Sequence, residues 1–278
     1  MLKANAVIQI VAAENVYGNV AGELGGPYVS VINILNSPTQ DPHLFTLTPA
    51  AAKAINKADI IIYNGADYDP WMRTALAIQG KKNRSVIPVA ALIDAKADAN
   101  PHLWYLPMTM PLFAKILVKT LIEMDPIHQA YYENQLNQFN QHYQIIFATI
   151  KRLRTQFQHT PVIATEPVFN NMADSIGLIV HGKKFQINVM NAIPPTISEI
   201  KSFEDDISQH KVKLLIYNTQ TIDPTTEHMR QLAIKEHIPV MGVSELMPDK
   251  ITFTQWMMKE LNTLESALSN QHGNKKHG

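Results

Sequence analysis

The chain has 278 residues, and its 24 lysines and arginines balance its 24 aspartates and glutamates. The zero net charge gives no indication of a nucleic-acid partner or of an electrostatic membrane surface, and the absence of cysteine excludes disulfides, thiolate metal ligands and thiol catalysis. With 46% hydrophobic residues the composition is that of a globular protein, and the length fits two domains better than one.

The first half of the sequence alternates short apolar runs with helical patterns. A strand at residues 7–11 is followed by a helix that ends at Gly25-Gly26, and a second strand is expected at residues 28–35. Thr48-Pro49 then opens a helix as N-cap and first helical residue. Further strands are expected at residues 60–65 and 85–92, with a helix at residues 69–79 between them. This alternation predicts a parallel α/β lobe that binds ligands beyond the carboxyl ends of its strands.

The middle of the chain is helical. A helix is expected at residues 110–123, and residues 127 to about 158 contain neither glycine nor proline. The second stretch predicts a helix of roughly thirty residues, on the order of 45 Å long, with much of its surface solvated. We interpret it as a rigid connector between two lobes; the alternative is a surface helix of a single domain.

The second half repeats the pattern of the first. Strands are expected at residues 162–165, 185–190, 213–217 and 239–243, and helices at residues 168–176, 196–210, 223–237 and 252–269. The sequence therefore predicts an α/β fold of two parallel-sheet lobes joined by one long backbone helix. The expected boundaries are residues 1–125 for the N-terminal lobe, 126–158 for the connecting helix and 159–278 for the C-terminal lobe.

One phrase occurs twice in the first half: D-P-H-L-F at residues 41–45 and N-P-H-L-W at residues 100–104. Proline fixes its own φ and favours an extended conformation in the residue before it. His43 and His102 are therefore expected in stiff, non-helical backbone, presented at the same rim of the lobe. Taken singly, each histidine is more simply a turn residue with a hydrogen-bonded ring.

Two carboxylates in the second half follow strands in the same way, Glu166 in A-T-E-P-V-F and Glu245 in G-V-S-E-L-M-P. A single such glutamate is more often a loop or helix N-terminal residue. Two imidazoles and two carboxylates together are donors that suit Zn²⁺, Mn²⁺ or Fe²⁺. No histidines stand at helical i, i+4 spacing as in HExxH, so such a site would be assembled from distant segments.

Nearly the whole chain resembles the metal-binding solute receptors of ABC importers, the zinc and manganese group whose two lobes are joined by one long helix. The stretches that carry the resemblance are A-A-E-N-V-Y-G-N-V-A, D-P-H-L-F, A-D-I-I-I-Y-N-G-A-D-Y-D-P-W-M, N-P-H-L-W, T-E-P-V-F-N-N-M-A-D-S-I-G-L and G-V-S-E-L-M-P. It implies His43 and His102 as the first two metal ligands. Glu166 takes the third ligand position, which is histidine in typical zinc receptors and glutamate in many manganese receptors. Glu245 takes the fourth, a carboxylate that is most often aspartate.

The resemblance further implies a receptor rather than an enzyme. It would bind one divalent ion, Zn²⁺ or Mn²⁺ with Fe²⁺ as a further option, and deliver it to the membrane permease of an ABC importer. A periplasmic or cell-surface location and a monomer are expected. Two departures from the family are the missing acidic, histidine-rich loop of many zinc receptors and the missing lipobox cysteine. Two carboxylates allow the five or six donors that Mn²⁺ accepts, whereas Zn²⁺ has the higher intrinsic affinity, so the donor set leaves the metal open.

Two other functions compete with the receptor. A metal-dependent hydrolase would need a general base and an oxyanion donor, and no motif supplies them. An adhesin or other interaction protein would use Trp71, Trp104 and Trp256 as anchors, although the patterning around each favours packing. Asn64, Asp67 and Asp69 are candidates to hydrogen-bond the ligand histidines, with solvated turn residues as the simpler interpretation.

Overall fold

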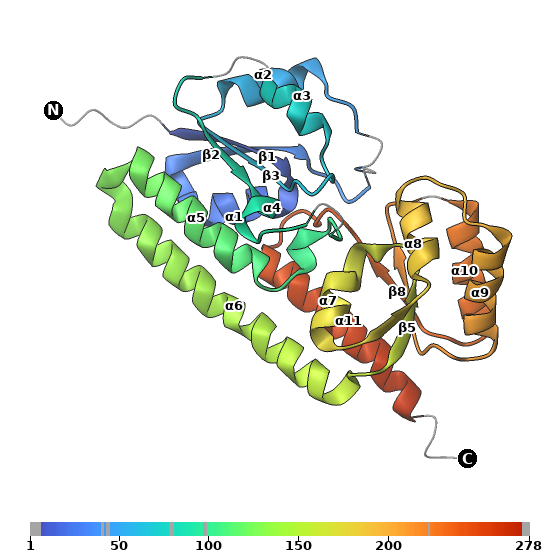
Figure 1. The fold of residues 1–278 in the computed structure, drawn as a ribbon. Coiled ribbons are helices and arrows are strands. Elements are labelled where there is room, and N and C mark those ends of the chain that lie inside the picture. The colour runs from blue at the N-terminus through green and yellow to red at the C-terminus, as the bar shows by residue number, and fades with distance from the viewer. Residues whose placement is uncertain are drawn as a thin grey trace. The chain divides into compact units, whose positions relative to one another are not determined.

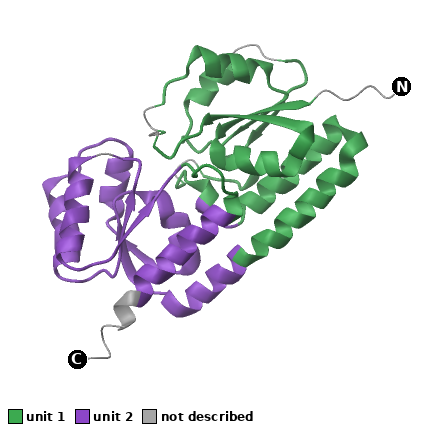
Figure 2. Cartoon of the chain, turned by 180° about the vertical axis from the view of Figure 1, so that it is seen from behind, with its two compact units in different colours: residues 1–104, 108–145, 246–254 green, residues 105–107, 146–245, 255–278 purple. Residues whose placement is uncertain are grey.

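The computed structural model describes residues 7–39, 42, 45–77, 81–96, 99–221 and 223–273, so His43 lies outside the described residues. The chain forms two compact units (Figure 2). Unit 1 contains residues 1–104, 108–145 and 246–254, and unit 2 contains residues 105–107, 146–245 and 255–278. Each unit therefore combines segments that are far apart in the sequence.

Unit 1 is built on a four-stranded parallel sheet with the order β2-β1-β3-β4. The strands are β1 (Ile8–Glu14), β2 (Val29–Leu35), β3 (Ile60–Tyr63) and β4 (Ser85–Pro88). Helices α1 (Asn15–Gly25) and α5 (Thr109–Met124) cover one face of the sheet, and α2 (Pro49–Lys57) and α3 (Trp71–Ala77) cover the other (Figure 1). A short helix, α4 (Val89–Leu92), follows β4 directly.

The apolar runs of unit 1 form its core, because a parallel sheet is buried on both faces. Val11 and Ile61 point to one face, where they pack with residues of α2 and α3. The start of α2 agrees with the prediction, since the Thr48 side chain accepts the backbone N–H of Ala51 at 3.1 Å and Pro49 is the first helical residue. Capping and strand burial together explain why these segments fold as they do.

Unit 2 has a second four-stranded parallel sheet, with the order β6-β5-β7-β8. Its strands are β5 (Pro161–Ala164), β6 (Ile179–His181), β7 (Leu215–Asn218) and β8 (Val240–Val243). Its helices are α7 (Asn170–Ile176), α8 (Lys183–Met190), α9 (Ile197–Ser208), α10 (Pro224–Lys235) and α11 (Phe253–Gly273), the last beginning within unit 1. Side chains of α8, α9 and α10 pack with those of β5 and β7 in one hydrophobic cluster.

The long helix predicted in the middle of the chain is confirmed as α6 (Gln129–Phe157), which has 29 residues and is about 43 Å long. Its buried hydrophobic side chains repeat at intervals of mostly three and four and form one stripe: Tyr132, Phe139, Tyr143, Ile146, Ile150, Leu153 and Phe157. The rest of its surface is largely solvated, as predicted. The fold is thus two α/β lobes joined by a long helix. Neither α6 nor any other described helix combines the length and apolarity that crossing a membrane requires.

Two predicted strands were wrong in whole or in part. Residues 185–190 form the end of α8, and the strand of this region is β6, shortly before it. The sequence F-Q-I-N-V-M alternates like a strand, but Phe185 and Val189 are also four residues apart, so one helix face carries both into the core. The strand expected at residues 85–92 ends at Pro88, because α4 begins at Val89.

The two sheets repeat each other in register as well as in order. Ala12 of β1 pairs with Ile62 of β3, and Ala164 of β5 pairs with Ile216 of β7. The sequences that begin at these paired residues also agree. A-A-E at residues 12–14 corresponds to A-T-E at residues 164–166, and I-Y-N occurs at residues 62–64 and 216–218. Glu14 and Asn64 of unit 1 therefore hold the positions that Glu166 and Asn218 hold in unit 2.

Candidate metal-binding residues

His102 is fully buried, and the first residue of its own N-P-H phrase holds its ring. Its Nδ1 lies 2.7 Å from Asn100 Oδ1, and its backbone N–H donates to the same oxygen at 3.1 Å. Because this oxygen accepts the backbone N–H, the ring Nδ1 donates to it as well. In the neutral ring the lone pair is then on Nε2, the tautomer that would bind a cation through that atom.

Aromatic rings pack around the imidazole of His102. Tyr68 and Trp104 meet it edge to face, with ring centroids 5.8 and 5.5 Å away. Trp104 and Trp256 are each 1% exposed, so the prediction that these two pack rather than anchor a partner is confirmed. The imidazole is therefore held by packing as well as by Asn100.

Asn64 fixes the loop that carries His102. Its Nδ2 donates to the carbonyl oxygen of Pro101 at 2.8 Å, and its Oδ1 accepts the hydroxyl of Tyr17 at 2.5 Å. Its backbone N–H donates to Asp69 Oδ2 at 2.7 Å. Asn64 and Asp69 are buried, so the simpler interpretation as solvated turn residues was wrong for both, because this turn folds its aspartate back onto the end of β3. Asp67 is exposed, as that interpretation expected.

Asp69 shares the interior of unit 1 with Glu14. Burial is the main cause that raises the pKa of both carboxyls, that of Glu14 well above its usual range and that of Asp69 to about 6. The negative charge of Asp69 raises the pKa of Glu14 further, whereas the backbone N–H groups of Asn64 and Gly65 stabilise the Asp69 carboxylate. Glu14 is therefore the member of the pair that holds a proton, and Asp69 is the ionised one.

Unit 2 brings the two predicted carboxylate ligands to one edge of its sheet. Glu166 follows β5 and is 3% exposed, and Glu245 follows β8 and is fully buried. Strands β5 and β8 lie on either side of β7 in the sheet. The carboxyl ends of parallel strands meet at the same edge, so both glutamates belong to the edge where α/β sheets bind ligands.

A group of polar residues at the end of β7 holds Glu245. Asn218 Nδ2 donates to Glu245 Oε1 at 2.7 Å, and the backbone N–H of Glu245 donates to Gln220 Oε1 at 2.5 Å. Asn218 Oδ1 in turn accepts the backbone N–H of Gln220 at 3.0 Å. Neither Asn218 nor Gln220 was predicted; the sequence signal that could have found Asn218 is the repeated I-Y-N.

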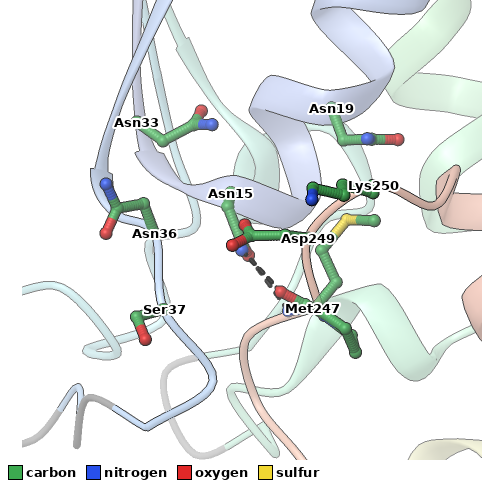
Figure 3. Close-up of a pocket in the computed structure, with 9 residues that line it drawn as sticks. Asn15, Asn19, Asn33, Asn36, Ser37, Met247, Asp249 and Lys250 are labelled. Carbon is green, nitrogen blue, oxygen red and sulfur yellow. Dashed lines mark hydrogen bonds between the residues drawn. The ribbon is translucent and has the colours of Figure 1, made fainter.

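A polar pocket of unit 1 is lined by none of the three predicted ligands that the structure describes. It has a volume of about 360 Å³ and lies between α1, the end of β2 and residues 247–250 (Figure 3). On one wall Asn15 binds the backbone of Met247, donating to its oxygen at 2.8 Å and accepting from its nitrogen at 3.1 Å. Asn19 likewise binds Ile251 O and Phe253 N. These contacts anchor the segment that follows Glu245 onto α1.

The structure thus locates three of the four predicted ligands. No group of three or more His, Asp or Glu side chains that would hold a metal ion is found among the described residues. His43 is outside them, His102 belongs to unit 1, and Glu166 and Glu245 belong to unit 2. One imidazole with a fixed tautomer and two buried carboxylates are donor types that suit a borderline divalent cation. The complete ligand set stays a prediction.

Comparisons with known proteins agree with this chemistry. Residues 10–267 match the family model described as zinc-uptake complex component A, periplasmic. A relative from Streptococcus gordonii, a manganese ABC transporter substrate-binding lipoprotein, is 25% identical across 96% of this chain and 90% of its own length. Another from Streptococcus anginosus, with the same description, is 23% identical across 84% of this chain and 78% of its own.

Solved structures share the fold. The periplasmic zinc-binding protein TroA from Treponema pallidum has a TM-score of 0.79 at 17% identity and covers 94% of this chain and 99% of its own. A manganese-bound periplasmic metal-binding protein from Candidatus Liberibacter asiaticus has a TM-score of 0.75 at 19% identity, with the same coverage. These proteins are named as binding or transport proteins and not as enzymes. The chain belongs to the family of zinc-uptake complex component A periplasmic proteins.

Proposed function

We propose that this protein captures one divalent transition-metal ion, Zn²⁺ or Mn²⁺, outside the cytoplasm and delivers it to the membrane permease of an ABC importer. The observation that supports this most directly is the convergence of two buried glutamates at one edge of the unit 2 sheet, in a member of a metal-receptor family. Monomeric action, a periplasmic or cell-surface location and the three-part division at residues 125 and 158 belong to the same proposal.

The proposed ligands are His43, His102, Glu166 and Glu245. His102 supplies Nε2, since Asn100 engages Nδ1. The two glutamates supply negative charge, which a divalent cation neutralises. Buried carboxylates are costly without such a counter-charge or hydrogen bonds.

Protons compete with the metal for these ligands. Imidazole must be neutral to bind a cation, and histidine side chains titrate near about 6.5. Metal affinity is therefore expected to fall as the pH drops through that range. Release of the ion at low pH supplies a readout of ligand chemistry that does not depend on the permease.

The choice of metal depends on the third ligand. Relatives are named for manganese, and a structural neighbour is named for zinc. A glutamate at position 166 allows chelation by both oxygens and the higher coordination numbers that Mn²⁺ accepts, whereas histidine favours four-coordinate Zn²⁺. Glu166→His is expected to shift the ratio of Zn²⁺ to Mn²⁺ affinity toward zinc, and an unchanged ratio in competition titrations would count against the donor argument.

Calorimetric titration of the metal-stripped protein tests the ligands one at a time. His102→Ala, Glu166→Gln and Glu245→Gln are each expected to weaken binding by more than about 100-fold, since even the outer partners of metal ligands contribute 10- to 100-fold. His128→Ala is the matched control in unit 1, because its Nδ1 also has a side-chain acceptor, Asp125 Oδ2 at 2.6 Å. Glu260→Gln is the control for a buried carboxyl of unit 2. Equal effects of ligand and control variants would overturn the assignment.

A further inference from the structure

The repeated I-Y-N places an asparagine at the same point of both sheets. In unit 1 it directly follows β3, and in unit 2 it is the last residue of β7; these strands hold equivalent places in the orders β2-β1-β3-β4 and β6-β5-β7-β8. Both asparagines are buried, Asn64 at 0% and Asn218 at 5% exposure. A buried amide is stable only when its donors and acceptors are satisfied, so its partners show what it holds in place.

In each unit one of those partners lies in the loop that carries a proposed ligand. Asn218 Nδ2 donates to the side chain of Glu245 itself, and Asn64 Nδ2 donates to the carbonyl of Pro101, the residue before His102. In unit 2 the loop follows the neighbouring edge strand β8, and in unit 1 it follows α4, the short helix after the neighbouring edge strand β4. The amide reaches the ligand carboxylate in one lobe and the ligand backbone in the other.

Asn218 also contacts the strand end that carries the second glutamate. Its backbone N–H faces Thr165 Oγ1 at 3.4 Å, and Thr165 directly precedes Glu166. Strand β7 lies between β5 and β8, so one residue is linked to both carboxylate-bearing strands. Asn218 thus contacts Glu245 through its side chain and Thr165 through its backbone N–H.

We infer that the duplicated strand-end asparagines are positioning residues for metal binding, and that Asn218 also determines preference between metals. This inference rests on the proposed function. An N–H held on Glu245 Oε1 occupies a lone pair of that oxygen and limits how the carboxylate chelates a cation. Loss of this N–H removes one restraint on chelation through both oxygens, a geometry that Mn²⁺ accepts more readily than Zn²⁺.

The test is a titration of metal-stripped Asn218→Ala with Zn²⁺ and with Mn²⁺. Zn²⁺ affinity is expected to fall about 10- to 100-fold and Mn²⁺ affinity by less, so the preference shifts toward manganese. The electron paramagnetic resonance spectrum of bound Mn²⁺ is expected to change, which a general loss of stability would not produce. Asn188→Ala is the matched control, because Asn188 Nδ2 donates to Glu199 Oε2 at 2.9 Å elsewhere in unit 2. If Asn218→Ala folds poorly, Asn218→Ser takes its place, since its hydroxyl is too short to replace the amide.

A double-mutant cycle separates this inference from the proposed function. If Asn218 acts through Glu245, Asn218→Ala has no further effect on affinity in a Glu245→Gln background. If Glu245→Gln alone leaves affinity unchanged, Glu245 is not a ligand and the proposed function loses that residue. If Glu245→Gln weakens binding but Asn218→Ala changes neither affinity nor preference, the proposed function stands and the positioning role of Asn218 is overturned.

For unit 1 the expected pattern differs. Asn64→Ser shortens the side chain so that it no longer reaches Pro101, and it is expected to weaken Zn²⁺ and Mn²⁺ by similar factors, because Asn64 holds the backbone before His102 and not a ligand atom. An effect on preference as large as that of Asn218→Ala would contradict the distinction between the two lobes.

Discussion

Glu14 and Glu166 occupy the same position in the two lobes, yet their surroundings give them different chemistry. Glu14 is the last residue of β1 and Glu166 lies two residues after β5, the second strands in their sheet orders, and I-Y-N stands at the end of the neighbouring strand in each unit. In unit 1 the pKa of Glu14 is raised by burial and further by the charge of Asp69, which the loop after β3 supplies. In unit 2 the loop after β7 returns Gln220, whose amide oxygen accepts the N–H of Glu245.

The two lobes therefore differ in the loop after the third strand of each sheet order. In unit 1 that loop supplies an aspartate, which accepts the backbone N–H groups of Asn64 and Gly65 and forms a buried acid pair with Glu14. In unit 2 that loop supplies the amide of Gln220, and the buried carboxyls at this edge of the sheet belong to the proposed ligands Glu166 and Glu245.

The largest expected difference between the two lobes is in metal affinity after each glutamate is replaced by glutamine. Glu166→Gln is expected to weaken metal binding by more than about 100-fold, whereas Glu14→Gln is expected to change it by less than about 3-fold. Calorimetric titration of the two stripped variants with the same metal gives the ratio directly. Comparable losses in both variants would show that the lobes are not divided in this way.

Replacing Asn64 tests whether its amide fixes the loop before His102 in unit 1. Asn64→Ala leaves the Tyr17 hydroxyl and the Pro101 carbonyl without the amide that binds them. The free energy of unfolding is expected to fall by about 2–4 kcal/mol, measured by urea denaturation. A loss below about 1 kcal/mol would mean that water replaces the amide and that the loop before His102 is not fixed by it.

The acid pair predicts a pH dependence of stability. The folded-state pKa values of Glu14 and Asp69 lie above those of the unfolded chain, so their protons stabilise the fold at low pH. That contribution is lost as the pH rises from about 4 through the Asp69 pKa of about 6 and beyond. The free energy of unfolding of Glu14→Gln is expected to exceed that of the wild type by about 1–2 kcal/mol at pH 8 and to equal it at pH 4.

Denaturation of wild type and Glu14→Gln at several pH values checks this, with Asp67→Asn as the control because Asp67 is an exposed acid of the same turn. If the free energies of unfolding of wild type and Glu14→Gln differ by the same amount at every pH, the pKa of Glu14 is not raised in the folded protein.

The smallest expected effect concerns the helices that precede β3 and β7, which both begin with threonine. Thr48 caps α2 alone, whereas Thr196 and Glu199 form a reciprocal capping box at the start of α9. Thr48→Ala and Thr196→Ala are each expected to lower the free energy of unfolding by about 1 kcal/mol, because each removes the side-chain oxygen that accepts one backbone N–H of the first turn. Thermal denaturation of the two variants checks the size of the loss.

Much of the fold could be predicted from the sequence because its signals are local. The Thr48-Pro49 cap, the Gly25-Gly26 stop and the glycine-free stretch of α6 each depend on neighbouring residues only. The prediction failed at residues 185–190, where period two and the helical i, i+4 spacing fit the same six letters and tertiary packing decided between them.

The candidate site was predictable to a smaller extent. Proline and histidine in a repeated phrase are visible in the sequence, but the partners of the ligands depend on which strands become neighbours. The contact of Asn218 with Glu245 spans 27 residues and exists because β7 lies next to β8. Asn64 and Asp69 look like ordinary turn residues until the fold buries them.

The most direct test of the receptor is the metal content of the purified protein, measured by elemental analysis beside that of the His102→Ala, Glu245→Gln double variant. The account predicts one Zn²⁺ or Mn²⁺ ion per chain in the wild type, regained after stripping and exposure to the metal, and none in the variant. A stripped wild type that takes up neither ion, or a variant that takes up as much as the wild type, would contradict it.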